Sequence, residues 1–205
     1  MLARLLDYLF PVRDDEAIVR DIQDGEFLAL MAPEVHAGAG RHIVSLLPFT
    51  DERVRAAVHE AKYRGSERAF GLLALVLGEY LGQLHEETPL TGALLVPIPL
   101  GSLRERERGF NQVEEVLKRV AAGVPAAIAA DSLVRTRETV SQISLPKWKR
   151  LKNMHGAFAA RRVPSPARTY LIIDDVTTTG ATLGAAAEAL EKAGAENILL
   201  LAFAH

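Results

Sequence analysis

The stretch LIIDDVTTTGATL, residues 171–183, decides the fold of this chain. It opens with a short apolar run of the kind that forms a buried strand. Asp174 and Asp175 end that run as neighbouring anions, and threonines and Gly180 separate them from an alanine-rich helical pattern. A buried strand that leads through a polar loop into a helix is the repeating unit of an α/β protein with a parallel sheet.

The rest of the chain continues this alternation. Asp51 is a plausible helix N-cap and Gly65 a plausible helix stop, which bound the first clear helix. The patterns predict helices at 52–64, 67–83, 111–122 and 182–193 and strands at 93–100, 169–174, 197–204 and, more weakly, 126–134. Because the strands are filled by continuous apolar residues, the sheet should be parallel and covered by helices on both faces.

The length of the chain bounds its domain organisation. At 205 residues there is room for one well-cored domain plus an appendage. Residues 1–50 look irregular and loop-like. We therefore expect an N-terminal appendage over 1–50 and the α/β domain over 51–205.

The composition excludes several classes of function. The net charge of −2 predicts no global attraction to nucleic acid or membrane, so a polyanion site must be local. No apolar run reaches the roughly 18 residues that a membrane span needs. The first residues read as an amphipathic helix and not as a signal peptide. We expect no membrane insertion and a cytoplasmic location, and the absence of a P-loop motif excludes that class of nucleotide kinase.

Metal-ligating residues are sparse. The chain contains no cysteine, which excludes disulfides, thiol nucleophiles and thiolate metal sites. Its six histidines show no ligand spacing. We predict that the protein holds no zinc.

Two polar loops follow predicted strands, PIPLGS at 97–102 and DDVTTTG at 174–180. In open α/β sheets, ligands bind beyond the carboxyl ends of the strands. Both loops are therefore candidate binding loops.

The loop after Asp175 has the features of an anion site. Gly180 permits a tight turn, and the helix that starts near Ala181 directs backbone N–H groups and its positive dipole end into the loop. The hydroxyls that can donate to phosphate oxygens belong to Thr178, Thr179 and Thr182.

The two carboxylates need a different partner, since they only accept hydrogen bonds and would repel phosphate. They should face hydroxyl groups or a hydrated divalent cation. A ribose with its 5′-phosphate in the threonine loop meets both requirements. The alternative is that Asp175 caps a helix and Asp174 is only solvated.

Three blocks together resemble the ComF family, a phosphoribosyltransferase-like group associated with natural competence and DNA uptake. They are VPIPL…RERGFNQ, RTRETVSQISLPKWKRLKNMHGAF and DDVTTTGATL, and the similarity covers residues 54–205. The last block also resembles the phosphoribosyl pyrophosphate (PRPP) motif of type I phosphoribosyltransferases. The resemblance implies a type I phosphoribosyltransferase-like parallel sheet with a hood and a flexible loop.

The resemblance also assigns roles to residues. Asp174 and Asp175 would bind the ribose hydroxyls of PRPP, with Mg²⁺ accompanying the ligand, and Arg108 would be the cation of the pyrophosphate loop. The residues implied to cradle the 5′-phosphate are Thr178, Thr179, Gly180, Ala181 and Thr182. The implied pyrophosphate loop comprises Leu100, Gly101, Ser102 and Arg108. We expect a non-proline cis peptide at Leu100–Gly101.

The basic segment between 135 and 158 has two possible uses. It would be the flexible loop that closes over pyrophosphate, or it would bind single-stranded DNA by surrounding an aromatic ring with cations. The residues concerned are Gln142, Lys147, Trp148, Lys149, Arg150, Lys152 and Asn153, with Arg161 and Arg162 beyond them. Phe158 also matches a family position, and we expect it to pack in the core. Arg104 and Arg106 belong either to the site or to an exposed charged run.

One departure from the family concerns the N-terminus. Members usually carry a cysteine-rich zinc module after an LFP-like stretch, and this chain keeps YLFP at 8–11 without any cysteine. Residues 1–50 either keep the shape of that module without metal or do something else.

The predicted function is Mg²⁺-dependent phosphoribosyl transfer with release of pyrophosphate, in which Asp174, Asp175 and Arg108 carry the chemistry. The alternative is a non-catalytic PRPP- or nucleotide-binding module that handles single-stranded DNA. The competence association makes a competence helicase a candidate partner. The residues specify neither the acceptor nucleophile nor an oligomeric state.

Overall fold

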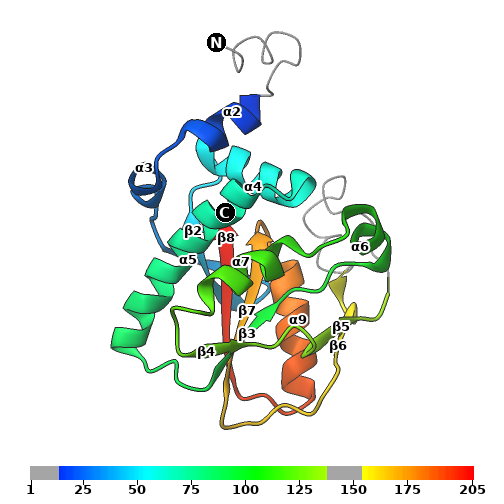
Figure 1. Ribbon diagram of the computed structural model, residues 1–205. Helices are drawn as coiled ribbons and strands as arrows, with labels where there is room; N and C mark the ends of the chain where they lie inside the picture. Colours follow the sequence, from blue (N-terminus) through cyan, green and yellow to red (C-terminus); the bar gives the residue numbers. More distant parts are fainter. Residues whose placement is uncertain (1–13, 138–153) are drawn as a thin grey trace, which may run out of the picture.

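A computed structural model describes residues 14–137 and 154–205 of the chain, and its centre is a six-stranded sheet in the order β1-β2-β8-β7-β3-β4 (Figure 1). The strands are β1 (Glu34–Gly38), β2 (Arg41–Leu47), β3 (Ala93–Pro97), β4 (Ala126–Ile128), β7 (Thr169–Val176) and β8 (Asn197–Ala204). Within this sheet, as far as the structure describes it, the β1–β2 pair is antiparallel and the other pairs are parallel. The prediction of a parallel α/β sheet is confirmed, and this architecture is consistent with a phosphoribosyltransferase-like fold.

Helices cover both faces of the sheet (Figure 1). The first face is covered by α4 (Glu52–Arg64), α5 (Glu67–Glu87) and α7 (Gln112–Val120), with α2 (Asp14–Asp21) and α3 (Asp24–Leu28) packed on α4 and α5. The second face is covered by α9 (Ala181–Lys192) and by the two-stranded sheet of β5 (Leu133–Arg135) and β6 (Phe158–Ala160). A short helix, α6 (Ser102–Arg108), lies between β3 and α7.

Strand β7 shows why the apolar runs are continuous. Leu171 and Ile173 are buried in the core under α4, α5 and α7, whereas Tyr170 and Ile172 are buried in the core under α9. Successive side chains of a strand point to opposite faces, so a strand covered on both faces needs apolar residues at every position.

Most predicted elements are present. The α4 helix begins after Asp51, whose side chain accepts a hydrogen bond from the Arg53 N–H, and ends at Gly65 with a φ of 62°. The weak strand prediction at 126–134 proves to be two short strands, β4 and β5, in different sheets. Among the described residues, no helix combines the length and apolar character needed to cross a membrane.

The expectation that residues 1–50 are irregular is wrong for 14–21 and 24–28, which form α2 and α3, and also for 34–47. This part forms the β1–β2 hairpin, and β2 pairs with β8 as a full member of the sheet. The stretch MAPEVHAGAGRHI, residues 31–43, looks loop-like in the sequence, but it contains β1, the start of β2 and the tight turn between them. The division at residue 50 stays a prediction about domain organisation, although the sheet continues across it.

The hairpin also lies against the threonine loop. Gly180 has a φ of 71°, and a Cβ atom there would lie 2.4 Å from Ile43 Cδ1 and 2.9 Å from the Gly38 carbonyl carbon. Ile43 and Gly38 belong to β2 and β1. The loop before α9 therefore takes its shape partly from the N-terminal hairpin.

We predict that Gly180→Ala lowers the free energy of unfolding by at least about 2 kcal/mol, because a left-handed backbone conformation and a steric overlap both penalise the added methyl group. Urea unfolding measures the change. Gly78→Ala is the matched control, since Gly78 lies inside α5 with no atom within 4 Å of its added Cβ. It should raise the stability by about 0.5–1 kcal/mol. Equal effects of the two substitutions would contradict the packing described for Gly180.

Candidate functional site

The two candidate loops begin side by side at one edge of the sheet. Pro97 of β3 is paired with Ile173 of β7, and the Ile98 N–H donates to the Ile173 carbonyl at 3.0 Å. The loop after β3 therefore leaves the sheet next to Asp174. Asn111 closes this loop by donating its Nδ2 to the Ile98 carbonyl at 2.9 Å while its Oδ1 caps α7.

Asp175 is a buried carboxylate with three hydrogen-bonding partners. Its Oδ2 lies 2.8 Å from Lys62 Nζ and accepts from Gln112 Nε2 at 2.5 Å, and its Oδ1 accepts from the Val176 N–H at 2.7 Å. Burial alone would raise the pKa of the Asp175 carboxyl, but the Lys62 ammonium and the Gln112 amide hold it below its usual value. Asp175 is therefore an anchored anion.

Asp174 is placed differently, although it is the neighbouring residue. Its Oδ1 accepts the Asp175 N–H at 2.9 Å, and its side chain is only partly buried by surface area. Burial and the Asp175 charge raise the pKa of Asp174 to about 7, against the opposing influence of Lys62 and Arg135. Among the described residues, no cation lies within ion-pair distance of Asp174, and its side chain is more exposed than that of Asp175.

The alternative reading of Asp175 as a helix cap is excluded. Helix α9 begins at Ala181, and its N-cap is Gly180. Asp175 instead belongs to β7.

Arg108 provides a positive charge beside the carboxylates. Its guanidinium donates to Gln112 Oε1 at 2.9 Å and lies 5.1 Å from the centroid of the Tyr63 ring. Burial lowers the pKa of Arg108 below its usual value, although the Asp175 charge opposes the shift. Among the described residues, no carboxylate lies within ion-pair distance of this guanidinium. A half-buried cation of this kind can bind an anion.

The two other arginines of α6 differ from each other in exposure. Arg106 is exposed and donates to the Ser102 carbonyl, whereas Arg104 is half-buried on the same short helix. Ser102, the first residue of α6, is also exposed.

The expected cis peptide at Leu100–Gly101 is wrong, since every peptide bond in the described ranges is trans. Gly101 is extended, with φ −70° and ψ 150°, and acts as the N-cap of α6. The chain therefore enters a helix directly, and Leu100 and Gly101 do not form a separate strained turn.

The threonine loop lies between β7 and α9. The Thr177 N–H donates to the Ala204 carbonyl at 3.0 Å, which ties the loop to β8. Thr179 is buried, and its hydroxyl accepts the Ala181 N–H at 3.4 Å. Thr178 is exposed and Thr182 is half-buried on the first turn of α9. The structure therefore places these residues around the helix N-terminus, with Thr178 the most accessible to a ligand.

Helix α4 supplies site residues that sequence reasoning missed. Its last turn brings Lys62 to Asp175 and Tyr63 to Arg108, and Gly65 lies under the ring of Phe110, where a Cβ atom would be 3.1 Å from Cε1. The KYRG stretch signals only a helix end. Contacts with residues so distant in the sequence leave no local pattern.

Together, these side chains form one continuous network of contacts. Asp175 contacts Lys62 and Gln112, and Gln112 and Tyr63 both contact Arg108. Because Lys62 and Tyr63 are adjacent in α4, this network connects the end of β7 to both α4 and the loop after β3.

Only the two ends of the predicted flexible loop lie within the described residues. The ends of the loop are held together, since the Thr136 N–H and hydroxyl donate to the carbonyls of Ala157 and Gly156. Phe158 is buried under Arg135, which confirms that it packs in the core. The other predicted loop residues, Gln142, Lys147, Trp148, Lys149, Arg150, Lys152 and Asn153, lie outside the described residues. Arg162 pairs with Asp131.

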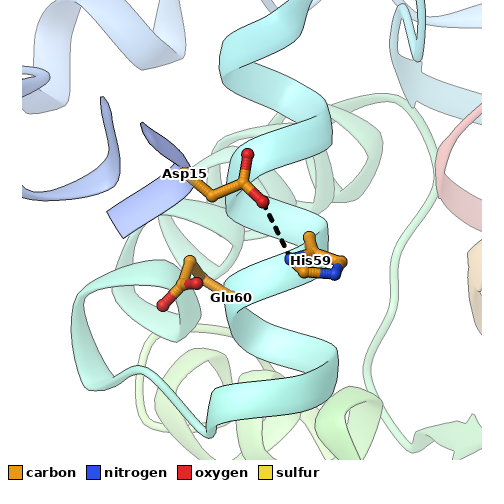
Figure 2. A group of neighbouring side chains, drawn as sticks. All are labelled: Asp15, His59 and Glu60. Carbon is orange, nitrogen blue, oxygen red and sulfur yellow. Dashed lines mark ion pairs between the residues drawn. The ribbon is translucent and has the colours of Figure 1, made fainter. Parts of the chain in front are cut away.

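A second polar cluster joins α2 to α4 (Figure 2). It comprises Asp15, His59 and Glu60, whose potential ligand atoms all lie within 4.8 Å of one another. However, His59 Nδ1 lies only 2.9 Å from Asp15 Oδ2, a direct polar contact that leaves no room for an ion between these atoms. Two ligands of one zinc ion lie further apart than this. The absence of zinc stays a prediction.

Known proteins share sequence with this chain, although no family model matches it. The chain is 31% identical over 159 residues to DNA utilization protein YhgH of Salmonella typhimurium, which covers 77% of this chain and 69% of the relative. It is 30% identical over 106 residues to Competence protein F of Haemophilus influenzae, covering 51% and 46%. It is 37% identical over 103 residues to Competence protein ComFC of Streptococcus pneumoniae, covering 50% and 44%.

The fold and site define the class first: an α/β protein with a phosphoribosyltransferase-like sheet and an acidic pair at its carboxyl edge. The similarity to the relatives then gives the family. The chain belongs to the ComF family.

The raised pKa of Asp174 predicts a pH-dependent effect of Asp174→Asn on stability. A carboxyl whose pKa is higher in the folded than in the unfolded state contributes stability at low pH, and this contribution is lost as the pH rises through about 7. Relative to wild type, Asp174→Asn should therefore become progressively more stable from about pH 4 to about pH 7 and change little above that pH. Urea unfolding at several pH values measures this. Glu105→Gln removes an exposed carboxylate from α6 and is the control; a pH-independent difference for Asp174→Asn would contradict the raised pKa.

Proposed function

We propose that this protein binds PRPP together with Mg²⁺ and transfers its phosphoribosyl group to a nucleophile with release of pyrophosphate. The observation that carries the proposal is the pairing of opposite charges at one sheet edge. Asp174 and Asp175 end β7, and Arg108 is joined to Asp175 through a single side chain, Gln112.

Each part of PRPP has a complementary group in this arrangement. The ribose hydroxyls would donate to Asp175 and to Asp174, whose Oδ2 accepts no hydrogen bond from the residues that the structure describes. The 5′-phosphate would bind at the threonine loop and the N-terminus of α9, where N–H groups and the helix dipole favour an anion. The pyrophosphate would contact Arg108, whose guanidinium can donate two parallel hydrogen bonds.

The donor set fits Mg²⁺ bound through the ligand. Asp174 is a carboxylate whose pKa is raised to about 7 by burial and a neighbouring anion, so additional positive charge would stabilise its ionised form. Mg²⁺ prefers oxygen ligands and keeps several waters. When bound, it would supply neutralising charge to the leaving pyrophosphate.

The proposed reaction needs positioning more than a protein nucleophile. The acceptor would form a bond to the anomeric carbon as the bond from that carbon to pyrophosphate breaks. The bonding electrons would leave with pyrophosphate, and the acceptor proton would pass to solvent. Asp174 and Asp175 would hold the ribose in place, and Arg108 would stabilise the leaving charge.

The names of the relatives support a role in DNA utilisation during competence. We propose this as the cellular setting of the protein. A second candidate function is a non-catalytic module that binds single-stranded DNA through the basic segment around Trp148. The sequence KWKRLK at 147–152 favours it, because cations beside an aromatic ring suit a stacked single strand.

The first test of the proposed function is thermal stability with Mg²⁺ and PRPP. A ligand at 100 times its dissociation constant adds about 2.7 kcal/mol of stability. For a chain of this size, the melting temperature should rise by about 5–10 °C. Arg108→Ala and Asp174→Asn should each remove most of this rise, and pyrophosphate release should fall with it.

Arg106→Ala is the matched control, because Arg106 lies on the same helix but is exposed. It should leave the ligand-induced rise unchanged. If PRPP does not stabilise the wild-type protein, or if the control loses as much of the rise as Arg108→Ala, the proposed site is wrong.

The second candidate predicts a salt-dependent affinity for a single-stranded oligonucleotide. A plot of the logarithm of the affinity against the logarithm of the salt concentration should have a slope of about −0.7 for each neutralised phosphate. Replacing Lys147, Lys149 and Lys152 together should reduce the slope by about two. Trp148→Ala should cost about 1–3 kcal/mol through lost stacking. Fluorescence anisotropy measures both effects, and the absence of binding at low salt would eliminate this candidate.

A further inference from the structure

Lys62 occupies a position that the proposed function does not explain. Its Nζ lies 2.8 Å from Oδ2 of Asp175, the carboxylate that the proposed function, on which this inference rests, assigns to a ribose hydroxyl. Burial alone would lower the pKa of the Lys62 ammonium, but the Asp175 carboxylate raises it above its usual value. The cation and the ligand hydroxyl therefore compete for one carboxylate.

Most of the hydrogen-bonding capacity of Asp175 is already used before a ligand binds. A carboxylate offers about four acceptor positions on its two oxygens. Three are used by Lys62, by Gln112 and by the Val176 N–H. Gln112 is buried and Val176 donates through its backbone, whereas Lys62 reaches Asp175 on a flexible four-carbon stem and is therefore the partner that can change position.

Pyrophosphate bound at Arg108 would offer the Lys62 ammonium group a second anionic partner. Lys62 is the residue before Tyr63, whose ring lies under the Arg108 guanidinium. Arg108 is itself joined to Asp175 through Gln112. The lysine stem has four rotatable carbons, so its charge can move while α4 stays in place. An anion bound at Arg108 would attract the ammonium away from Asp175.

We propose that Lys62 acts as a transferable cation, which neutralises Asp175 in the free protein and moves to pyrophosphate when the ligand binds. The ribose and pyrophosphate parts of the site then both require the same movement. Whichever part binds first meets the free-energy cost of breaking the Lys62–Asp175 ion pair, and the second part binds without it. Binding at the two parts is therefore positively coupled, and the coupling is reciprocal.

The test uses ribose 5-phosphate and inorganic pyrophosphate as separate probes, each titrated calorimetrically with excess Mg²⁺ at pH 8. Each titration is repeated in the presence of a saturating amount of the other probe. For the wild-type protein, each probe should strengthen the binding of the other by the same factor, on the order of 10-fold.

Lys62→Met should change the two affinities in different directions. Pyrophosphate should bind about 10-fold more weakly, since a cation is lost, whereas ribose 5-phosphate should bind at least as tightly as before. The coupling factor should fall to about one. A lysine with only a structural role would weaken both probes in parallel. Lys118→Met is the matched control, because Lys118 pairs with Glu114 and Glu115 on the surface of α7. It should behave as wild type.

The outcomes separate this inference from the proposed function. If the wild-type protein binds neither probe, the proposed function fails. If it binds both without positive coupling, or if Lys62→Met weakens both equally or keeps the coupling, the transferable cation is wrong and the proposed function stands. If Lys62→Met does not fold, Lys62→Gln serves as a second uncharged variant. The coupling between the two probes is measured on the wild-type protein and does not depend on either variant.

Discussion

The ion pair between Lys62 and Asp175 is the interaction on which the rest of the site depends. Two adjacent carboxylates at the end of a buried strand repel each other, and one of them needs a cation to remain ionised. Lys62 provides that charge from α4, so the acidic pair consists of one anchored anion and one open carboxyl. The same pair holds the last turn of α4 against the sheet edge. Removing one partner of a buried ion pair commonly costs about 3–5 kcal/mol, so this geometry is also structurally constrained.

The N-terminal region supports the site from two directions. The β1–β2 hairpin contacts the threonine loop at Gly180 and extends the sheet beyond β8. On the other face, Asp15 of α2 pairs with His59, whose ring lies 4.8 Å from the ring of Tyr63. Tyr63 in turn contacts Arg108. The N-terminal region, which lacks the cysteines of the family's zinc module, is therefore connected to both binding loops through packing and polar contacts.

Local sequence patterns predicted much of the fold and part of the site. Asp51 and Gly65 bound α4 because capping is a contact between near neighbours in the sequence. The apolar run at 169–174 formed a central strand because both faces of the sheet are covered. The β1–β2 hairpin was missed because glycine and alanine in a tight turn resemble a loop. The Leu100–Gly101 expectation failed because Gly101 caps α6, a helix too short and too charged to show an apolar period.

The sequence by itself determined the α/β class, the acidic pair after a buried strand, and the glycine- and threonine-containing loop that precedes a helix. Each of these features depends on residues that are adjacent in the sequence or one helical turn apart. Only the tertiary structure decided that Lys62 and Gln112 contact Asp175, that Tyr63 lies under Arg108, and that Asp174 is the carboxyl with the raised pKa. The physical reason is that charge interactions and burial depend on distance in space. Residues from α4, α7 and β7 meet only once the sheet and its helices have packed.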